Sequence, residues 1–158
     1  MTVMKVLTVC LGNICRSPAA QGILQAKANI QGIDISLDSA GTAAYHVGNH
    51  PDPRSIAVLD NRGIDISIQR ARQVIITDFE EFDWVLAMDK ENVNNLKRIC
   101  PSLLHYKIQL FGSINVNKNE KTTHLGEVVD PYYGNENDFS VMADHLDVLA
   151  EHFLYCVR

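Results

Sequence analysis

Residues 4–18, MKVLTVCLGNICRSP, contain the pattern that decides the fold. The apolar run over residues 4–9 predicts a buried strand, and residues 18–28 predict a helix that begins with a proline. Proline suits a first helical position because it has no N–H group to leave unpaired there. A strand, a tight loop and a helix in this order direct successive backbone N–H groups to one point. The sequence therefore predicts an anion site at the N-terminus of this helix.

The loop itself carries a cysteine and an arginine separated by five residues, Cys10 and Arg16. Backbone N–H dipoles, a helix N-terminus and a guanidinium together favour the thiolate form of Cys10. The planar guanidinium of Arg16 can donate to two phosphate oxygens at once, which a lysine cannot do. Ser17 can donate a hydrogen bond to the thiolate, while Gly12 and Asn13 suit left-handed backbone geometry. Because this spacing arises by chance for about one cysteine in twenty, the flanking strand and helix are what favour a phosphate loop over a buried structural cysteine.

Two motifs carry a resemblance to a known family. Residues 10–18, CLGNICRSP, resemble the active-site loop of the low-molecular-weight protein tyrosine phosphatases, and residues 130–134, DPYYG, resemble the general-acid loop of that family. The segments at 38–42, 70–72 and 88–89 are similar too, so the resemblance covers nearly the whole chain. It implies a flavodoxin-like three-layer α/β fold with a central four-stranded parallel sheet flanked by helices.

The resemblance implies hydrolysis of phosphotyrosine and small aryl phosphates through a phosphocysteine intermediate. Cys10 would attack phosphorus, and Arg16 with the loop N–H groups would stabilise the charge on the phosphoryl oxygens. Asp130 would protonate the leaving oxygen and then activate a water molecule, with its direction restricted by Pro131; a simple turn is the alternative for this Asp-Pro pair. No metal or other cofactor is expected, because the loop supplies the positive potential. The phosphate loop would also include Leu11, Gly12, Asn13, Ile14, Cys15 and Ser17.

Three tyrosines complete the implied site, namely Tyr45, Tyr132 and Tyr133, as walls of the substrate cleft. Tyr45 lies in a long loop over residues 40–53, and loops of this length tend to be functional; an ordinary surface tyrosine is the alternative. Such walls favour a long aryl phosphate whose phosphorus reaches Cys10, whereas phosphoserine is too short. The expected partners are phosphotyrosine-containing proteins, with phosphate or another oxyanion in the loop. The resemblance also implies that Tyr132 and Tyr133 can be phosphorylated.

Two further positions leave alternatives open. Cys15 lies five positions after Cys10 in the same loop, and we hypothesise a reversible disulfide that protects Cys10 from irreversible oxidation. The alternative is that Cys15 only packs inside the loop. Gln69 stands where family members usually carry a histidine bonded to the loop asparagine. Its amide could still make one such hydrogen bond to Asn13, and the departure bears on the rigidity of the loop.

The bulk composition suits one domain over residues 1–158. With 46% hydrophobic residues the chain can bury a core, and a net charge of -5 gives no basic surface for nucleic acid or anionic membrane. The apolar run at 3–11 is too short for a membrane span and lacks the plan of a signal peptide, so a cytoplasmic protein is expected. The four cysteines match neither a zinc site nor a secreted disulfide framework, and Cys100 and Cys156 are interpreted as core residues. A monomer is expected.

Strands alternating with helices predict a parallel sheet that is covered on both faces. Gly32 should end the first helix, Thr77 should cap a short helical turn, and Asp89 with Asn92 should cap a helix rather than serve the site. The last helix should bury residues spaced by threes and fours against the sheet. Beyond the opening stretch, strands are expected at 33–37, 83–88 and 106–110, helices at 53–61, 78–82, 90–99 and 138–157, and an irregular segment at 111–129.

Three other functions compete with this interpretation. Arsenate reductases share a similar loop but need a relay of two further cysteines close together, and residues 73–99 contain no cysteine. Protein arginine phosphatases typically carry threonine where Ile14 stands. A phosphotyrosine-binding module without turnover would lack Cys10 or Asp130, and both are present.

Overall fold

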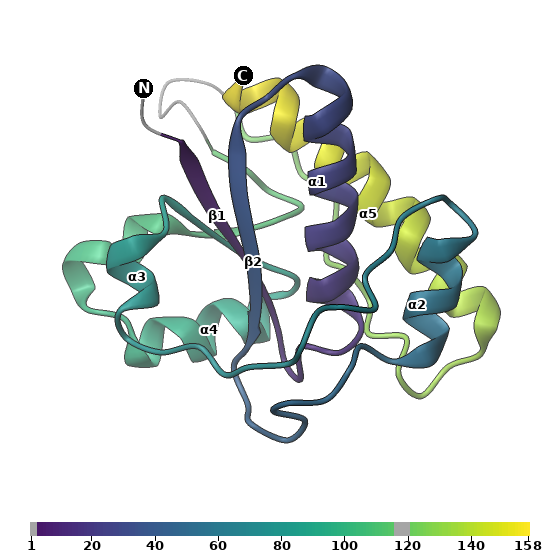
Figure 1. Ribbon diagram of the computed structural model, residues 1–158. Coiled ribbons are helices and arrows are strands. Elements are labelled where there is room, and N and C mark those ends of the chain that lie inside the picture. The colour runs from purple at the N-terminus through teal and green to yellow at the C-terminus, as the bar shows by residue number, and fades with distance from the viewer. Residues whose placement is uncertain (1–2, 116–120) are drawn as a thin grey trace.

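Four parallel strands in the order β2-β1-β3-β4 form the centre of the molecule (Figure 1). The computed structural model describes residues 3–115 and 121–158. Helices α1 and α5 cover one face of the sheet, and α3 and α4 cover the other (Figure 1). The elements are β1 (Met4–Cys10), α1 (Arg16–Gln31), β2 (Ile35–Gly41), α2 (Pro53–Asp60), α3 (Asp78–Glu81), β3 (Trp84–Ala87), α4 (Lys90–Ile99), the 3-10 helix η1 (Ser102–Lys107), β4 (Ile108–Leu110) and α5 (Glu136–Val157).

Alternation along β1 divides the core into two clusters. Val6 and Cys10 belong to a cluster with α1 and α5, whereas Leu7 and Val9 belong to a cluster with α3 and α4. Successive side chains of a strand point to opposite faces, so a strand buried on both faces is apolar at nearly every position. This confirms the predicted flavodoxin-like fold, in which β1 is central and both faces are covered.

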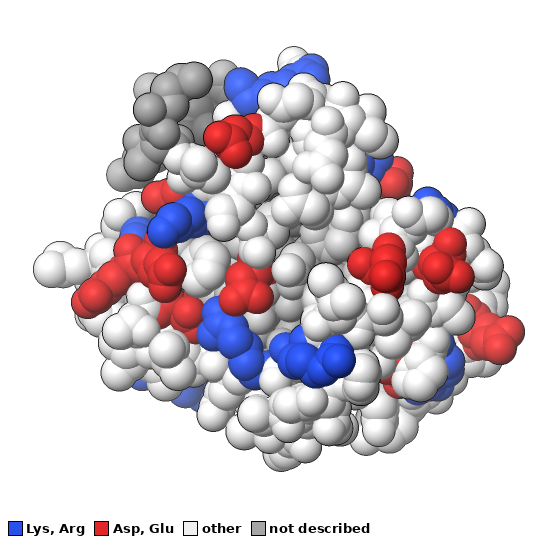
Figure 2. Space-filling model, viewed as in Figure 1, with Lys and Arg blue, Asp and Glu red and all other residues white. Residues whose placement is uncertain are grey.

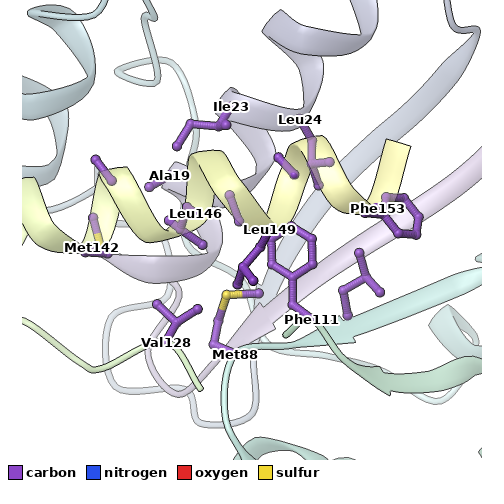
Figure 3. Close-up of a cluster of buried hydrophobic side chains, with 14 of the residues drawn as sticks. Ala19, Ile23, Leu24, Met88, Phe111, Val128, Met142, Leu146, Leu149 and Phe153 are labelled. Carbon is purple, nitrogen blue, oxygen red and sulfur yellow. The ribbon is translucent and has the colours of Figure 1, made fainter. Parts of the chain in front are cut away.

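The larger cluster packs the last helix against the sheet, as its spacing predicted. Figure 3 shows Met142, Leu146, Leu149 and Phe153 of α5 directed toward Met88, Phe111 and Val128, with Ala19, Ile23 and Leu24 of α1 beside them. The Phe153 ring meets Phe111 and Trp84 edge to face, with centroid distances of 6.3 and 5.3 Å. This packing fixes α1, and therefore the loop before it, relative to the sheet.

Two element boundaries differ from prediction for reasons of pairing. β2 begins at Ile35 and runs to Gly41, because it pairs with β1 along its whole length, from Met4 opposite Ile35 to Cys10 opposite Gly41. The prediction ended this strand at residue 37 and placed residues 40 and 41 in the following loop. β4 begins only at Ile108, since residues 102–107 form η1 after Pro101.

Several end signals in the sequence have the roles expected of them. Gly32 follows α1 with φ of 68°, and Asp89 and Asn92 form a capping box at α4. α5 starts at Glu136, two residues before the predicted start, because Asn135 and Asp138 form a second capping box. The short α3 has the predicted position and Thr77 is its N-cap residue, as predicted, but the capping hydrogen bond expected of Thr77 is not made. Its side chain makes no cap hydrogen bond, and the carboxylate of Asp78 instead accepts from the N–H of Ile75.

The two outlying cysteines differ from each other. Cys100 is buried as predicted, in the cluster on the α3 and α4 face, whereas Cys156 near the end of α5 is only half-buried. The prediction of Cys156 as core was therefore wrong, because the residues that α5 buries in the cluster at this end are Phe153 and Leu154, and Cys156 is not among them. Of the predicted irregular segment at 111–129, residues 116–120 lie outside the described residues, and the rest contains no helix or strand.

The surface carries both signs of charge. On the face shown in Figure 2, basic and acidic side chains are interspersed rather than gathered in one basic field. Ion pairs at the surface of the molecule include Arg72 with Asp38 and Arg62 with Asp144. Within the described ranges no helix is long and apolar enough to cross a membrane.

Candidate active site

The loop after β1 turns at the carboxyl end of the sheet and runs directly into α1. Cys10 is the last residue of β1 and Arg16 the first of α1, and the side chains of both are almost fully buried. The N–H of Asn13 donates to the Cys10 Sγ at 3.3 Å, and the Ser17 hydroxyl lies 3.0 Å from the same sulfur. An amide and a hydroxyl are thus the polar neighbours of this sulfur, and the contact between Ser17 and Cys10 is the one that the sequence predicted.

Asn13 holds the loop from behind. Its backbone has φ of 57°, the one positive φ of a non-glycine residue in the described part of the chain. The side-chain amide donates to the hydroxyls of Ser17 and Ser39 at 2.8 and 2.9 Å, and its oxygen accepts from the N–H of Arg72 at 3.0 Å. Asparagine tolerates the left-handed region better than most residues, so conformation and side-chain bonding agree at this position.

Gly12 is required for space rather than for its φ angle. Its φ is not positive, which corrects the prediction from sequence. A Cβ atom at this position would lie 2.9 Å from Cδ2 of His46, closer than real contacts allow. The glycine thus lets the loop at 42–52 approach the phosphate loop closely.

Gln69 does not bond Asn13 directly, contrary to prediction. The three side-chain hydrogen bonds of Asn13 are made with other partners, and the Gln69 amide bonds one of those partners, Ser39. It donates to the carbonyl of Pro18 at 3.1 Å and accepts from the Ser39 hydroxyl at 3.4 Å. Gln69 therefore supports the loop asparagine through Ser39.

Arg16 is held by groups from three segments of the chain. Its Nη1 donates to a carboxylate oxygen of Asp89 and, at 3.0 Å, to the carbonyl of Val128. Its Nη2 lies 3.8 Å from a carboxylate oxygen of Asp130. Burial works against the cation, but Cys10 and then the bonded Asp89 leave the pKa of Arg16 above its ordinary value. Asp89 thus caps α4, as predicted, and also directs the arginine, a role that the sequence prediction had set aside.

Asp130 lies at the rim of the pocket above Cys10. Its side chain is 42% exposed, and its Oδ1 accepts from the N–H of Tyr132 at 3.1 Å. The Asp-Pro pair therefore does begin a turn, and that turn brings the carboxylate near Arg16. The pocket is lined by Cys10, Leu11, Gly12, Ile14, Cys15, Arg16, Tyr45, His46, Asp130, Tyr132 and Tyr133. All the predicted site residues except Asn13 and Ser17 line it, and those two support the loop from behind.

The aromatic wall includes one residue that sequence reasoning missed. The ring of His46 lies between Tyr45 and Tyr132, with centroids 6.5 and 6.2 Å away. Tyr132 in turn meets Tyr133 edge to face at 4.9 Å. Tyr45 and Tyr133 are mostly exposed, at 76% and 95%, so they form the mouth of the pocket. The position of His46 directly after Tyr45 was the available signal.

Two more residues that sequence reasoning missed, Asp52 and Arg54, support the pocket from the start of α2. Asp52 caps α2 through its side chain, and its own N–H donates to the carbonyl of Ile14 at 2.7 Å. Although burial opposes its ionisation, hydrogen bonds from Arg54 lower the pKa of Asp52 below its ordinary value. The sequence predicted only a loop over 40–53 and a helix over 53–61 here, and no motif distinguished these two residues.

Cys10, Cys15 and Cys100 are free thiols, the first two in the phosphate loop and the third elsewhere in the core. Burial raises the pKa of Cys15 well above its usual value, with Asp52 adding to the effect, so Cys15 is a neutral thiol packed inside the loop. Cys100 belongs to the cluster on the opposite face of the sheet from Cys10. Cys100 is therefore not placed to form, with Cys10, the thiol relay that an arsenate reductase needs.

Known proteins match the chain along nearly its whole length. Residues 5–158 match the family model described as low molecular weight phosphotyrosine protein phosphatase. A protein of that name from Schizosaccharomyces pombe is 38% identical over 155 residues, covering 96% of this chain and 95% of its own. The human protein of the same name is 39% identical over 141 residues, covering 87% of this chain and 85% of its own.

Solved structures agree with these matches. A protein tyrosine phosphatase from Entamoeba histolytica, crystallised with Hepes in its active site, superposes with a TM-score of 0.84 at 36% identity, covering 96% of this chain and 95% of the other. Vibrio vulnificus Wzb in complex with benzylphosphonate superposes with a TM-score of 0.82 at 27% identity, covering 98% and 99%. Fold, loop and matches lead to one conclusion: the chain belongs to the low-molecular-weight phosphotyrosine protein phosphatase family and is a phosphatase.

Proposed function

We propose that this protein hydrolyses phosphotyrosine in proteins, and small aryl phosphates, through a phosphocysteine intermediate. One observation carries the proposal: Cys10 and Arg16 of the phosphate loop line the same pocket as Asp130, which lies far along the sequence. Phosphoryl transfer from an aryl phosphate requires a nucleophile, a cation for the phosphoryl oxygens and an acid for the leaving oxygen. The thiol of Cys10, the buried guanidinium of Arg16 and the carboxyl group of Asp130 at the rim are groups of these three kinds.

In the first step the Cys10 thiolate attacks phosphorus, and the bond from phosphorus to the phenolic oxygen breaks as the S–P bond forms. Arg16 and the N–H groups of the loop stabilise the charge on the three equatorial oxygens. Protonated Asp130 gives its proton to the departing phenolate. In the second step Asp130 takes a proton from water, the water oxygen bonds to phosphorus, and Cys10 leaves as a thiolate.

Ser17 supports both steps from its place 3.0 Å from the Cys10 sulfur. A hydroxyl hydrogen bond stabilises the thiolate before attack and again when sulfur departs as an anion. The same bond cannot help while sulfur is bound to phosphorus, so it acts where charge on sulfur is largest.

The aromatic mouth supports an aryl substrate. Tyr45, Tyr132 and His46 stand around the entrance while Cys10 lies at its base, so a ring between phosphorus and the peptide backbone suits the depth. Benzylphosphonate, the ligand of the Wzb structure, places a ring and a phosphoryl-like anion in one small molecule. The pocket of this protein favours the same combination, with aromatic side chains at the entrance for a ring and the phosphate loop at the base for an anion.

We also propose a domain organisation, a location, an oligomeric state and a role for Cys15. The family match over residues 5–158 supports a single phosphatase domain that spans the chain. Action in the cytoplasm, a monomeric state and reversible protection of Cys10 by Cys15 are predictions from sequence.

The test is release of phosphate from phenyl phosphate by wild type, Cys10→Ser and Asp130→Ala, without added metal. We expect no turnover for Cys10→Ser and about 10²–10³-fold lower kcat/KM for Asp130→Ala, the range of a lost general acid. Vanadate binding by all three proteins checks that the loop is intact. A wild type that binds vanadate but releases no phosphate would support a binding module instead. Arsenate consumption coupled to a thiol reductant would support the reductase.

A further inference from the structure

Arg54, in the first turn of α2, joins the two loops of the site. We propose that Arg54 is a positioning residue for the general acid: it fixes the acid loop (residues 130–134) relative to the phosphate loop (residues 10–17). This inference rests on the proposed function, because it concerns the proton that Asp130 would deliver. Arg54 lines no part of the pocket above Cys10, so it acts only through its neighbours.

One side of this link is the phosphate loop. The N–H of Asp52 donates to the carbonyl of Ile14 at 2.7 Å, and the hydroxyl of Ser55 donates to the carbonyl of Cys15 at 3.1 Å. The start of α2 thus bonds two successive carbonyl groups of the phosphate loop. Those bonds anchor residues 52–55 to the loop that would hold the phosphoryl group.

The other side is the acid loop. Nη2 of Arg54 donates to the carbonyl of Tyr132 at 2.9 Å, and Nη1 donates to the carbonyl of Gly134 at 3.3 Å. Nε and Nη2 also donate to the two carboxylate oxygens of Asp52, at 3.1 and 3.0 Å. The guanidinium carbon lies 4.5 Å from the centroid of the Phe139 ring at the start of α5. One planar group therefore holds Asp52, two acid-loop carbonyls and an aromatic face.

Arginine is suited to this place by the number and directions of its donors. The four donations use four of the five N–H groups of the rigid guanidinium fork, whereas a lysine ammonium has three N–H groups that diverge from a single atom. A lysine at position 54 could keep the ion pair with Asp52, but it could not also reach both carbonyls.

The acid needs such support because its own side chain is weakly held. Asp130 is 42% exposed, and its nearest partners are the N–H of Tyr132 within its own loop and Arg16 at 3.8 Å. Its position over Cys10 is thus set by the backbone of the acid loop. Proton transfer requires the carboxyl within about 2.6–3.2 Å of the leaving oxygen, and a displacement of about 1 Å can cost 10²-fold in rate.

The experiment compares two substrates that differ in their need for an acid. Phenolate, like the tyrosyl side chain with a pKa of about 10, leaves poorly without a proton, whereas nitrophenolate is a far weaker base and leaves readily. We measure kcat/KM for phenyl phosphate and for p-nitrophenyl phosphate with wild type, Arg54→Met, Arg54→Lys and Asp130→Ala. Arg62→Met is the matched control, because Arg62 joins the C-terminal end of α2 to Asp144 of α5 without contacting either loop.

For Arg54→Met we expect phenyl phosphate to lose about 10–50-fold in kcat/KM and p-nitrophenyl phosphate less than about 3-fold, the same pattern as Asp130→Ala at smaller size. Arg54→Lys should show the pattern at about 5–10-fold, and Arg62→Met should leave both values within 2-fold. Vanadate affinity should change less than 3-fold, because the phosphate loop keeps its own bonds.

Equal losses for the two substrates, or a loss of vanadate affinity to match, would make Arg54 a structural residue and overturn the inference. If Arg54→Met does not fold, Arg54→Lys decides by the same ratio of substrates. A wild type with no activity on either substrate overturns the proposed function instead, and a wild type with activity but an unchanged ratio in both variants overturns the inference alone.

Discussion

Replacement of the buried Asn13 by alanine should destabilise the protein strongly. Asn13 is 2% exposed and makes three side-chain hydrogen bonds, to Ser17, Ser39 and the N–H of Arg72. Alanine leaves that N–H without its partner, which costs about 1–3 kcal/mol. It also removes two donations to hydroxyls, at about 0.5–1 kcal/mol each because both hydroxyls keep another partner.

The backbone adds a smaller contribution. At φ of 57° alanine is strained by about 1–2 kcal/mol, although asparagine already bears part of that strain. The sum is a loss of about 3–5 kcal/mol in the free energy of unfolding. Asn13→Gly loses the same hydrogen bonds without the strain. Glycine also raises the conformational entropy of the unfolded chain, however, which lowers the free energy of unfolding by about 0.4–1 kcal/mol. It should therefore be the milder variant by at most about 1 kcal/mol.

Urea unfolding followed by tryptophan fluorescence, with a thiol reductant present, measures these losses. For a slope of about 2 kcal/mol per molar urea, the midpoint of Asn13→Ala should fall by about 2 M. Asn29→Ala is the control, because Asn29 is exposed on α1 and its side chain has one surface hydrogen bond, from Gln25. Its midpoint should stay within about 0.3 M of wild type, since surface substitutions are usually within about 0.5 kcal/mol. A loss below 1 kcal/mol for Asn13→Ala would refute the view that these bonds hold the loop.

Two further outcomes follow from packing and charge. In Gly112→Ala the new Cβ would lie 1.8 Å from the carbonyl oxygen of Gly126; we expect about 3 kcal/mol of destabilisation, and a Tm unchanged within 1 °C would contradict the close approach. Hydrogen bonds from Arg54 lower the pKa of Asp52 in the folded state, although burial opposes its ionisation. The charged carboxylate therefore stabilises the fold fully above the ordinary carboxyl pKa of about 3.9, and this stabilisation is lost as pH falls through the lower folded pKa. Asp52→Asn should therefore be less stable than wild type at pH 7 and approach wild type as pH falls through the lowered folded pKa of Asp52. A stability gap that is independent of pH would show that the charge is unimportant.

The sequence by itself determined the parts of this protein that depend on neighbours along the chain. The apolar run before Cys10 and the glycine after α1 are local signals, and the fold class followed from the alternation of strands and helices. The predicted helix start at Pro18 was late by two residues, because α1 begins at Arg16. The resemblance of residues 10–18 and 130–134 identified the family, which the matches then confirmed. The sequence also predicted that Asp89 caps α4, because a capping box joins residues only three positions apart.

The tertiary structure decided what depends on contacts between distant segments. The length of β2 is set by its pairing with β1, and the need for glycine at position 12 is set by His46 from another loop. The second role of Asp89 appears only when Arg16, 73 positions away in sequence, lies beside it. Likewise Arg54 bonds carbonyls about 80 positions further on, and backbone carbonyls have no sequence signature because every residue carries one. Local signals thus specify the elements, whereas the bonds that orient the arginine and the acid exist only once those elements are packed.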